Sequence, residues 1–246
     1  MEPVCSVLLL HGILADAGLA VLFVRDEDPA RTGGGLILEP GAPGVAAARE
    51  PLSGGSWFGL RPGLAAGLVN RDPGARPGPR SRGLLLLDLL RGGGSLEAAL
   101  ADLPERAPAG RHGAFRLFLG DGRRLFTVDG PEGELPRPPQ EVPAGAWILR
   151  HQGGLGEAPE AFRPRRGEDC RGWSRRALAA LARHEPPGDP LCRHAKVDGG
   201  HASVNTTLAA LDPAGRPLAL AHGQGPPCRG RLREASEILA AWRGGG

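Results

Sequence analysis

Short apolar segments that come in pairs, with glycine, proline or aspartate between them, most constrain what this chain can fold into. The clearest pair is residues 115–119 and 124–128, which alternate in hydropathy on either side of Gly120-Asp121-Gly122. This pattern predicts a β-hairpin. Further hairpins are predicted from residues 4–10 with 19–25, 57–61 with 64–70, and 201–211 with 217–221. The 40 glycines and 25 prolines mostly separate such segments, which indicates a strand-rich fold with many turns.

Helical spacing of apolar residues predicts four helices, over residues 84–90, 96–103, 173–184 and 232–242. Ser95 is the expected N-cap of the second helix. With a short strand at 146–149, the order strands, helices, strands, helix, strands, helix indicates an α+β fold, two sheets with outer helices. Because 246 residues show neither a repeat nor a linker, we expect one domain over 1–246, with 231–246 as a C-terminal helix and flexible tail.

Charge and cysteine content argue against several classes of protein. Thirty basic and 27 acidic residues are interleaved and aromatics make up only 4%, which disfavours a nucleic-acid-binding face. Four cysteines without a C-x-x-C pair indicate a reducing compartment, and we expect a cytoplasmic protein. The apolar stretch 7–24 is interrupted by His11, Gly12 and Asp16, so it is interpreted as two strands and not as a signal peptide or membrane span.

Candidate ligands for metal and haem are present without a recognisable motif. Cys192-Arg193-His194, with Cys170 and His201 nearby, offers zinc-binding side chains, but the spacing fits no closed structural site. We therefore expect no metal. A C-x-x-C-H haem attachment motif is lacking as well, although a histidine or cysteine could hold a non-covalent haem. The sequence does not indicate which histidine or cysteine would bind the haem iron.

The strongest pattern lies around the second predicted hairpin. Its parts are, in chain order, Cys5, Val24-Arg25-Asp26-Glu27, Gly54-Gly55-Ser56-Trp57-Phe58-Gly59, Asn70-Arg71-Asp72-Pro73 and Arg80-Ser81-Arg82-Gly83. In this order they resemble the NRDE-domain family, the relatives of transport-and-Golgi-organisation protein 2. The likeness is strong through Arg91 and returns at 192–207 and 225–228. Val24 stands where the family has the Asn of its name motif, and Cys5 is not at position 2.

The family is similar in pattern to N-terminal-nucleophile (Ntn) hydrolases, especially the penicillin V acylase and bile-salt hydrolase branch. That resemblance implies a four-layer αββα sandwich of two mainly antiparallel sheets between helices. It also implies site roles. Cys5 would be the nucleophile, with its own α-amine as base. Asp26 would fix the amine or thiol, Arg25 would lower the thiol pKa or bind a substrate carboxylate, and the Asn70 side-chain amide would donate to the oxyanion.

Two functions follow, with a scaffold or regulator that has neither activity as a third interpretation, and the sequence leaves all three open. The resemblance implies cytosolic binding and trafficking of haem, or of a related hydrophobic metabolite, with no cofactor required. The alternative is a cysteine amidohydrolase acting on a linear or cyclic amide, which needs Cys5 as first residue. We hypothesise a translation start at position 4, so that removal of methionine exposes Cys5. In a chain starting at Met1, Cys5 is instead a buried strand residue and Asn70 a turn residue. The oligomeric state is left open.

Overall fold

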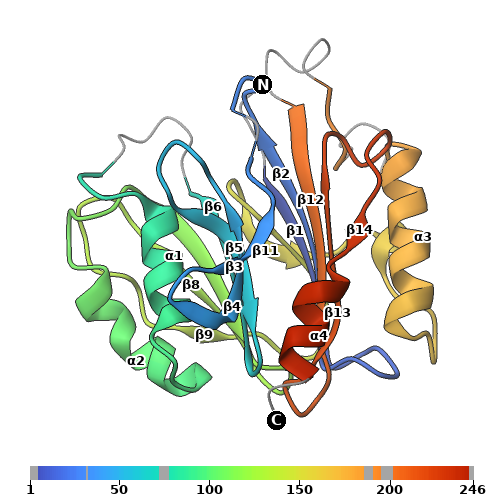
Figure 1. Cartoon of the computed structure of the whole chain (residues 1–246), viewed down its shortest axis with the longest axis horizontal. Helices are drawn as coiled ribbons and strands as arrows, with labels where there is room; N and C mark the ends of the chain where they lie inside the picture. The colour runs from blue at the N-terminus through green and yellow to red at the C-terminus, as the bar shows by residue number, and fades with distance from the viewer. Residues whose placement is uncertain (1–4, 32, 72–77, 186–190, 195–201, 244–246) are drawn as a thin grey trace.

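The computed structural model describes residues 5–31, 33–71, 78–185, 191–194 and 202–243. These residues form two seven-stranded sheets whose neighbouring strands pair antiparallel, with helices outside them (Figure 1). The first sheet runs β11-β10-β1-β2-β12-β13-β14. Its strands are β1 Ser6–His11, β2 Leu19–Glu27, β10 Gly145–Arg150, β11 Gly154–Glu157, β12 Ala202–Leu211, β13 Pro217–Gln224 and β14 Arg233–Glu234.

The second sheet keeps chain order throughout, from β3 to β9. Its strands are β3 Leu36–Glu39, β4 Ala42–Arg49, β5 Ser56–Arg61, β6 Leu64–Asn70, β7 Phe115–Gly120, β8 Leu125–Gly130 and β9 Gln140–Glu141. The helices are α1 Arg82–Arg91, α2 Leu96–Arg106, α3 Cys170–Ala182 and α4 Ser236–Arg243, with a short 3₁₀ turn at Glu160–Phe162. Among the described residues, none of the helices is both long and apolar enough to cross a membrane.

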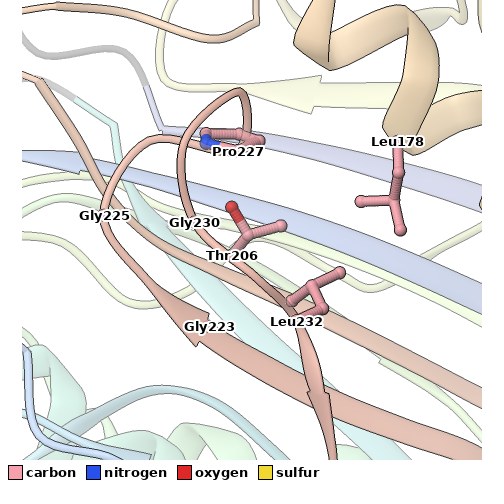
Figure 2. Close-up of a pocket in the computed structure, with 7 residues that line it drawn as sticks. All are labelled: Leu178, Thr206, Gly223, Gly225, Pro227, Gly230 and Leu232. Atoms are coloured by element: carbon pink, nitrogen blue, oxygen red, sulfur yellow. The ribbon is translucent and has the colours of Figure 1, made fainter.

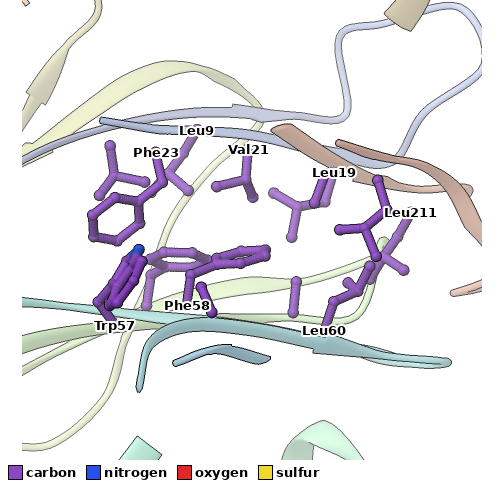
Figure 3. Close-up of a cluster of buried hydrophobic side chains, with 14 of the residues drawn as sticks. Leu9, Leu19, Val21, Phe23, Trp57, Phe58, Leu60 and Leu211 are labelled. Carbon is purple, nitrogen blue, oxygen red and sulfur yellow. The ribbon is translucent and has the colours of Figure 1, made fainter. Parts of the chain in front are cut away.

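Three apolar layers hold these elements together. Between the sheets, the ring centroid of Phe58 lies 6.5 Å from those of Phe23 and Phe118. Figure 3 shows Phe58 and Phe23 facing each other in this layer. Trp173 of α3 belongs to the layer on the outer face of the first sheet, and Leu86 of α1 to the layer on the outer face of the second. The predicted αββα arrangement of two antiparallel sheets between helices is therefore confirmed.

Most predicted elements form close to their expected bounds, and the helix starts show why. Ser95 accepts a hydrogen bond from the Ala98 backbone N–H at 3.3 Å, so it is the N-cap that was predicted for α2. Ser81 caps α1 in the same way, by accepting from Gly83 at 3.2 Å. Gly122, with φ of +96°, lies in the predicted turn between β7 and β8.

Two predictions of local structure are wrong. Residues 232–242 were expected to be one helix, but Arg233 and Glu234 pair with β13 and only Ser236–Arg243 is helical. No strand was predicted between residues 25 and 57, yet this segment forms β3 and β4. Both errors have the same cause, because unpaired backbone groups at a sheet edge bind any extended segment that reaches them. The end of the predicted C-terminal tail, residues 244–246, lies outside the described residues.

His222 on β13 makes the stability of the fold sensitive to acid. Its ring Nδ1 lies 2.8 Å from the Thr207 hydroxyl, and burial lowers the pKa of His222 from 6.5 to about 4. Below pH 6.5 the unfolded chain therefore binds a proton at His222 that the folded chain does not bind. The contribution of His222 to the free energy of unfolding is fully present above pH 6.5 and is lost as the pH falls to 4. We expect urea unfolding to show about 2 kcal/mol less stability at pH 5 than at pH 7.

The variant His222→Asn keeps a polar partner for Thr207 and removes the titrating ring. It is expected to lose most of this pH dependence in the same urea titrations. An unchanged dependence in the variant would assign the effect to another group, such as His112, whose pKa burial also lowers.

Candidate active site

Cys5 lies where the first two strands bring their free ends together. β1 and β2 pair antiparallel with Ser6 opposite Val24, so the residue before β1 lies beside the end of β2. That end carries Arg25 and Asp26. The Cys5 thiol lies 3.5 Å from the backbone carbonyl oxygen of Asp26 and donates to it. The hairpin alone therefore puts three of the predicted site residues side by side.

A cleft of about 540 Å³ opens at this end of the two sheets. We call it the Cys5 cleft. Cys5, Arg25 and Asp26 line it from the first sheet, and Asn70, the exposed last residue of β6, lines it from the second. The structure thus gathers all four predicted site residues around one cleft. Sequence reasoning assigned no role to several other lining residues, among them Glu50, Ser56, Trp57, Arg80, Arg82 and His151.

Arg25 presents a fixed positive charge to the cleft. It is only 5% exposed, and its guanidinium lies 4.5 Å from the centroid of the Trp57 ring. It also forms an ion pair with Glu27 at 3.1 Å and donates to the Arg31 carbonyl oxygen at 3.3 Å. Burial lowers the pKa of Arg25 and the charge of Glu27 opposes this, yet an arginine remains protonated at neutral pH. Cys5 therefore always faces a cation.

The Asp26 side chain is held mainly by the neighbouring strand β12 and by the segment 191–194, which precedes β12 in the sequence. Its carboxylate accepts a 2.6 Å hydrogen bond from the Ser203 hydroxyl of β12, and Arg193 lies 3.4 Å from the other carboxylate oxygen. Asp26 itself is 3% exposed. The hydrogen bond to the Cys5 thiol uses its backbone oxygen, not its side chain. In this state the carboxylate is a buried, oriented charge beside the sulfur.

The Cys5 thiol is not activated in the chain that carries residues before it. Burial raises the pKa of Cys5 to about 12, and the negative charge of Asp26 adds to the rise. Arg25 lowers the pKa, but by less. Since the thiolate is the nucleophile, this thiol is almost entirely protonated and unreactive at neutral pH. Activation requires a further positive charge or a base next to the sulfur.

Asn205 is a buried polar residue beside the cleft that sequence reasoning missed. It pairs with Arg25 across β12 and β2, and neither its side-chain nitrogen nor its oxygen has a hydrogen-bond partner among the described residues. Its side chain lies against Gly33, where an added Cβ would come 2.3 Å from the amide oxygen. The available signal was a strand with all ten positions buried that still carries Ser203, Asn205, Thr206 and Thr207. Residues 205–207 match a glycosylation sequon instead, which hid this signal.

No protein-family model and no curated protein matches the chain. Membership of the NRDE-domain family therefore stays a prediction. Among solved structures, the chain is similar to the Caenorhabditis elegans N-acylethanolamine-hydrolyzing acid amidase ortholog, with a TM-score of 0.49 and 12% sequence identity. The similarity covers 85% of this chain and 93% of that chain. At this level of similarity, the chemistry of the site has to be inferred from the side chains of this chain.

Proposed function

We propose that the protein is an amidohydrolase in which Cys5, as the first residue of the working chain, attacks the carbonyl carbon of an amide. The observation that supports this is the convergence of Cys5, Arg25, Asp26 and Asn70 on one cleft from three places in the sequence. A free α-amine at Cys5 would supply a base next to the thiol, whose pKa is raised. The proposal also agrees with the Ntn-hydrolase resemblance of the sequence.

The reaction needs two steps and no external oxidant or reductant. The α-amine of Cys5 takes the thiol proton, and the sulfur attacks the amide carbonyl to form a tetrahedral oxyanion. The Asn70 amide donates to this oxyanion. Collapse of the oxyanion breaks the C–N bond, and the protonated α-amine returns its proton to the departing nitrogen. Water, deprotonated by the α-amine, then hydrolyses the thioester to a carboxylic acid and frees Cys5.

A direct test uses protein produced from a coding sequence that starts Met-Cys5, with intact mass confirming that methionine has been removed. It is incubated with a panel of N-acyl amides and lactams. We expect turnover of at least one member and a transient acyl adduct on the Cys5 peptide. Cys5→Ser in the same form tests for an unrelated hydrolase in the preparation. Absence of both turnover and adduct across the panel, with Cys5 proven to be terminal and reactive, would remove the amidase proposal.

The oxyanion role of Asn70 has its own expected result. In the form that starts at Cys5, Asn70→Ala is expected to lower kcat by about 100-fold or more, because one donor to the oxyanion is lost. KM should change little, since the interaction forms in the transition state. Asn205→Ala is the matched comparison. A loss of kcat in Asn205→Ala with normal kcat in Asn70→Ala would indicate that Asn205 on β12, and not Asn70, donates to the oxyanion.

Haem binding in the same cleft is a second candidate function. Cys5 and His151 both line the cleft, and thiolate and imidazole are among the groups that hold haem iron in proteins. Arginines on the same lining can pair with the propionates. Under this alternative, hemin titration gives a saturable Soret shift that His151→Ala weakens. No saturable shift at micromolar hemin would exclude it.

A further inference from the structure

Four metal-ligating side chains meet at a place away from the Cys5 cleft. His184 follows the end of α3, Cys192 and His194 lie in the short segment 191–194, and Cys228 lies in the loop after β13. One ligand atom from each comes within 4.8 Å of all the others. The Nε2 atoms of His184 and His194 are 2.9 Å apart, and the Cys228 sulfur is 3.3 Å from Nε2 of His194. Cys192 is 1% exposed.

We propose that His184, Cys192, His194 and Cys228 bind one zinc ion. Two thiolates and two imidazoles are a common donor set of structural zinc sites. In a tetrahedron with Zn–N near 2.0 Å and Zn–S near 2.3 Å, ligand atoms lie about 3.3–3.8 Å apart. The four ligand atoms reach these tetrahedral separations if they move by less than about 1.5 Å from their present positions. Magnesium and calcium prefer oxygen donors, which this set lacks. Binding releases the thiol protons and requires no redox partner.

The backbone of His184, the first ligand in the sequence, has an unusual conformation. His184 has φ of +58° and is the only non-glycine residue with positive φ among those described. The left-handed conformation costs a histidine about 1 kcal/mol or more, so glycine would be the expected residue at this helix end. The backbone N–H of His184 still bonds to Leu181, which ties the imidazole to the last turn of α3. A ligand role explains why a strained histidine stands here.

The loop that carries Cys228 is shaped by its own backbone and packed beside α3. Gly225 has φ of +84° and donates to Val204 at 2.7 Å, while Gly230 donates to Pro226 at 2.7 Å. Figure 2 shows this loop above Thr206, with Leu178 of α3 facing the loop and Thr206 from the helix side. The loop, Thr206 and Leu178 line a small pocket of about 70 Å³. The fold thus packs the loop that carries Cys228 beside α3, the helix that precedes His184.

The zinc site also bears on Asp26, through Arg193. This residue stands between the ligands Cys192 and His194. Its backbone N–H donates to the Ser203 hydroxyl at 3.0 Å, its carbonyl oxygen accepts from the Ser203 N–H at 3.2 Å, and its guanidinium lies 3.4 Å from Asp26. Zinc would fix the chain on both sides of Arg193 and so hold the charge that faces Asp26. The metal site itself does not depend on the proposed amidase activity.

The test uses untagged full-length protein, loaded with zinc or cobalt under reducing conditions and freed of excess metal. We expect one zinc per chain by elemental analysis. The cobalt form should show tetrahedral visible bands and thiolate-to-cobalt charge transfer. Cys192→Ser, Cys228→Ser and His184→Asn should each lose most of the metal and alter these bands. Cys170→Ser and His222→Asn, which change a cysteine and a histidine outside the cluster, should keep one equivalent.

Two further measurements keep the result decisive where a variant fails to fold. Cys228→His preserves a ligand, so it should still bind cobalt tetrahedrally but with weaker charge transfer. Thiol titration of the metal-free wild type should find all four cysteines reduced. The proposal is overturned by wild-type protein that binds no metal, by equal metal content in ligand and control variants, or by a Cys192–Cys228 disulfide that forms and excludes metal under these conditions.

Discussion

A chain that begins at Cys5 is expected to react with iodoacetamide at Cys5 at least about 100 times faster, at pH 7.5, than the chain that begins at Met1. In the longer chain, burial and Asp26 raise the pKa of the thiol to about 12, so thiolate is almost absent. Cutting before Cys5 places an α-amine next to the sulfur. Its charge stabilises the thiolate, and its neutral form can take the thiol proton directly.

The measurement is the rate of adduct formation on each cysteine peptide by mass spectrometry. Cys170 is the internal reference in both forms, because burial raises its pKa to about 12 as well and it lies away from the new terminus. A second comparison places Gly-Cys5 at the terminus, which keeps an amine one residue too far away. Equal Cys5 rates in the three forms would mean that the terminus does not activate the thiol, and would remove the basis of the proposed chemistry.

Phe58→Ala is expected to destabilise the protein by about 3–5 kcal/mol. Phe58 is fully buried between the two sheets and contacts aromatic rings from both sides, Phe23 on β2 and Phe118 on β7. Removing its ring leaves a cavity that neither sheet can fill without changing its strand pairing. For a chain of this length the loss lowers Tm by about 10 °C.

Thermal and urea unfolding of Phe58→Ala and Phe58→Leu give the measurement. Leu refills part of the volume, so we expect a clearly smaller loss for it. Leu52→Ala is the surface control, since Leu52 is 76% exposed, and should change stability by under about 0.5 kcal/mol. A loss below about 1 kcal/mol for Phe58→Ala would show that the sheets repack freely, contrary to the aromatic contacts between them.

Local patterns predicted most of the fold because hairpins and helix caps are short-range. The turn at Gly122, the cap at Ser95 and the pairing of β1 with β2 each depend on residues close in sequence. The same locality placed Cys5 beside Arg25 and Asp26. β3, β4, β9, β11 and β14 were missed, since a strand without a clear hairpin signal forms only when a neighbouring strand edge offers its hydrogen bonds.

The sequence by itself determined two sheets with outer helices, the hairpin partners of Cys5 and the cap of α2, since periodicity and turn chemistry act over a few residues. Only the tertiary structure revealed the buried Asn205 amide beside the Cys5 cleft, whereas the family resemblance had already implied a site role for Asn70. The tertiary structure alone joined Cys192 and His194 to His184 and Cys228, where sequence spacing suggested no metal and offered Cys170 and His201, the latter outside the described residues. The physical reason is that ligand and catalytic geometry depends on distances in space. The number of residues between two side chains does not determine that distance when they lie on elements that are far apart in the sequence.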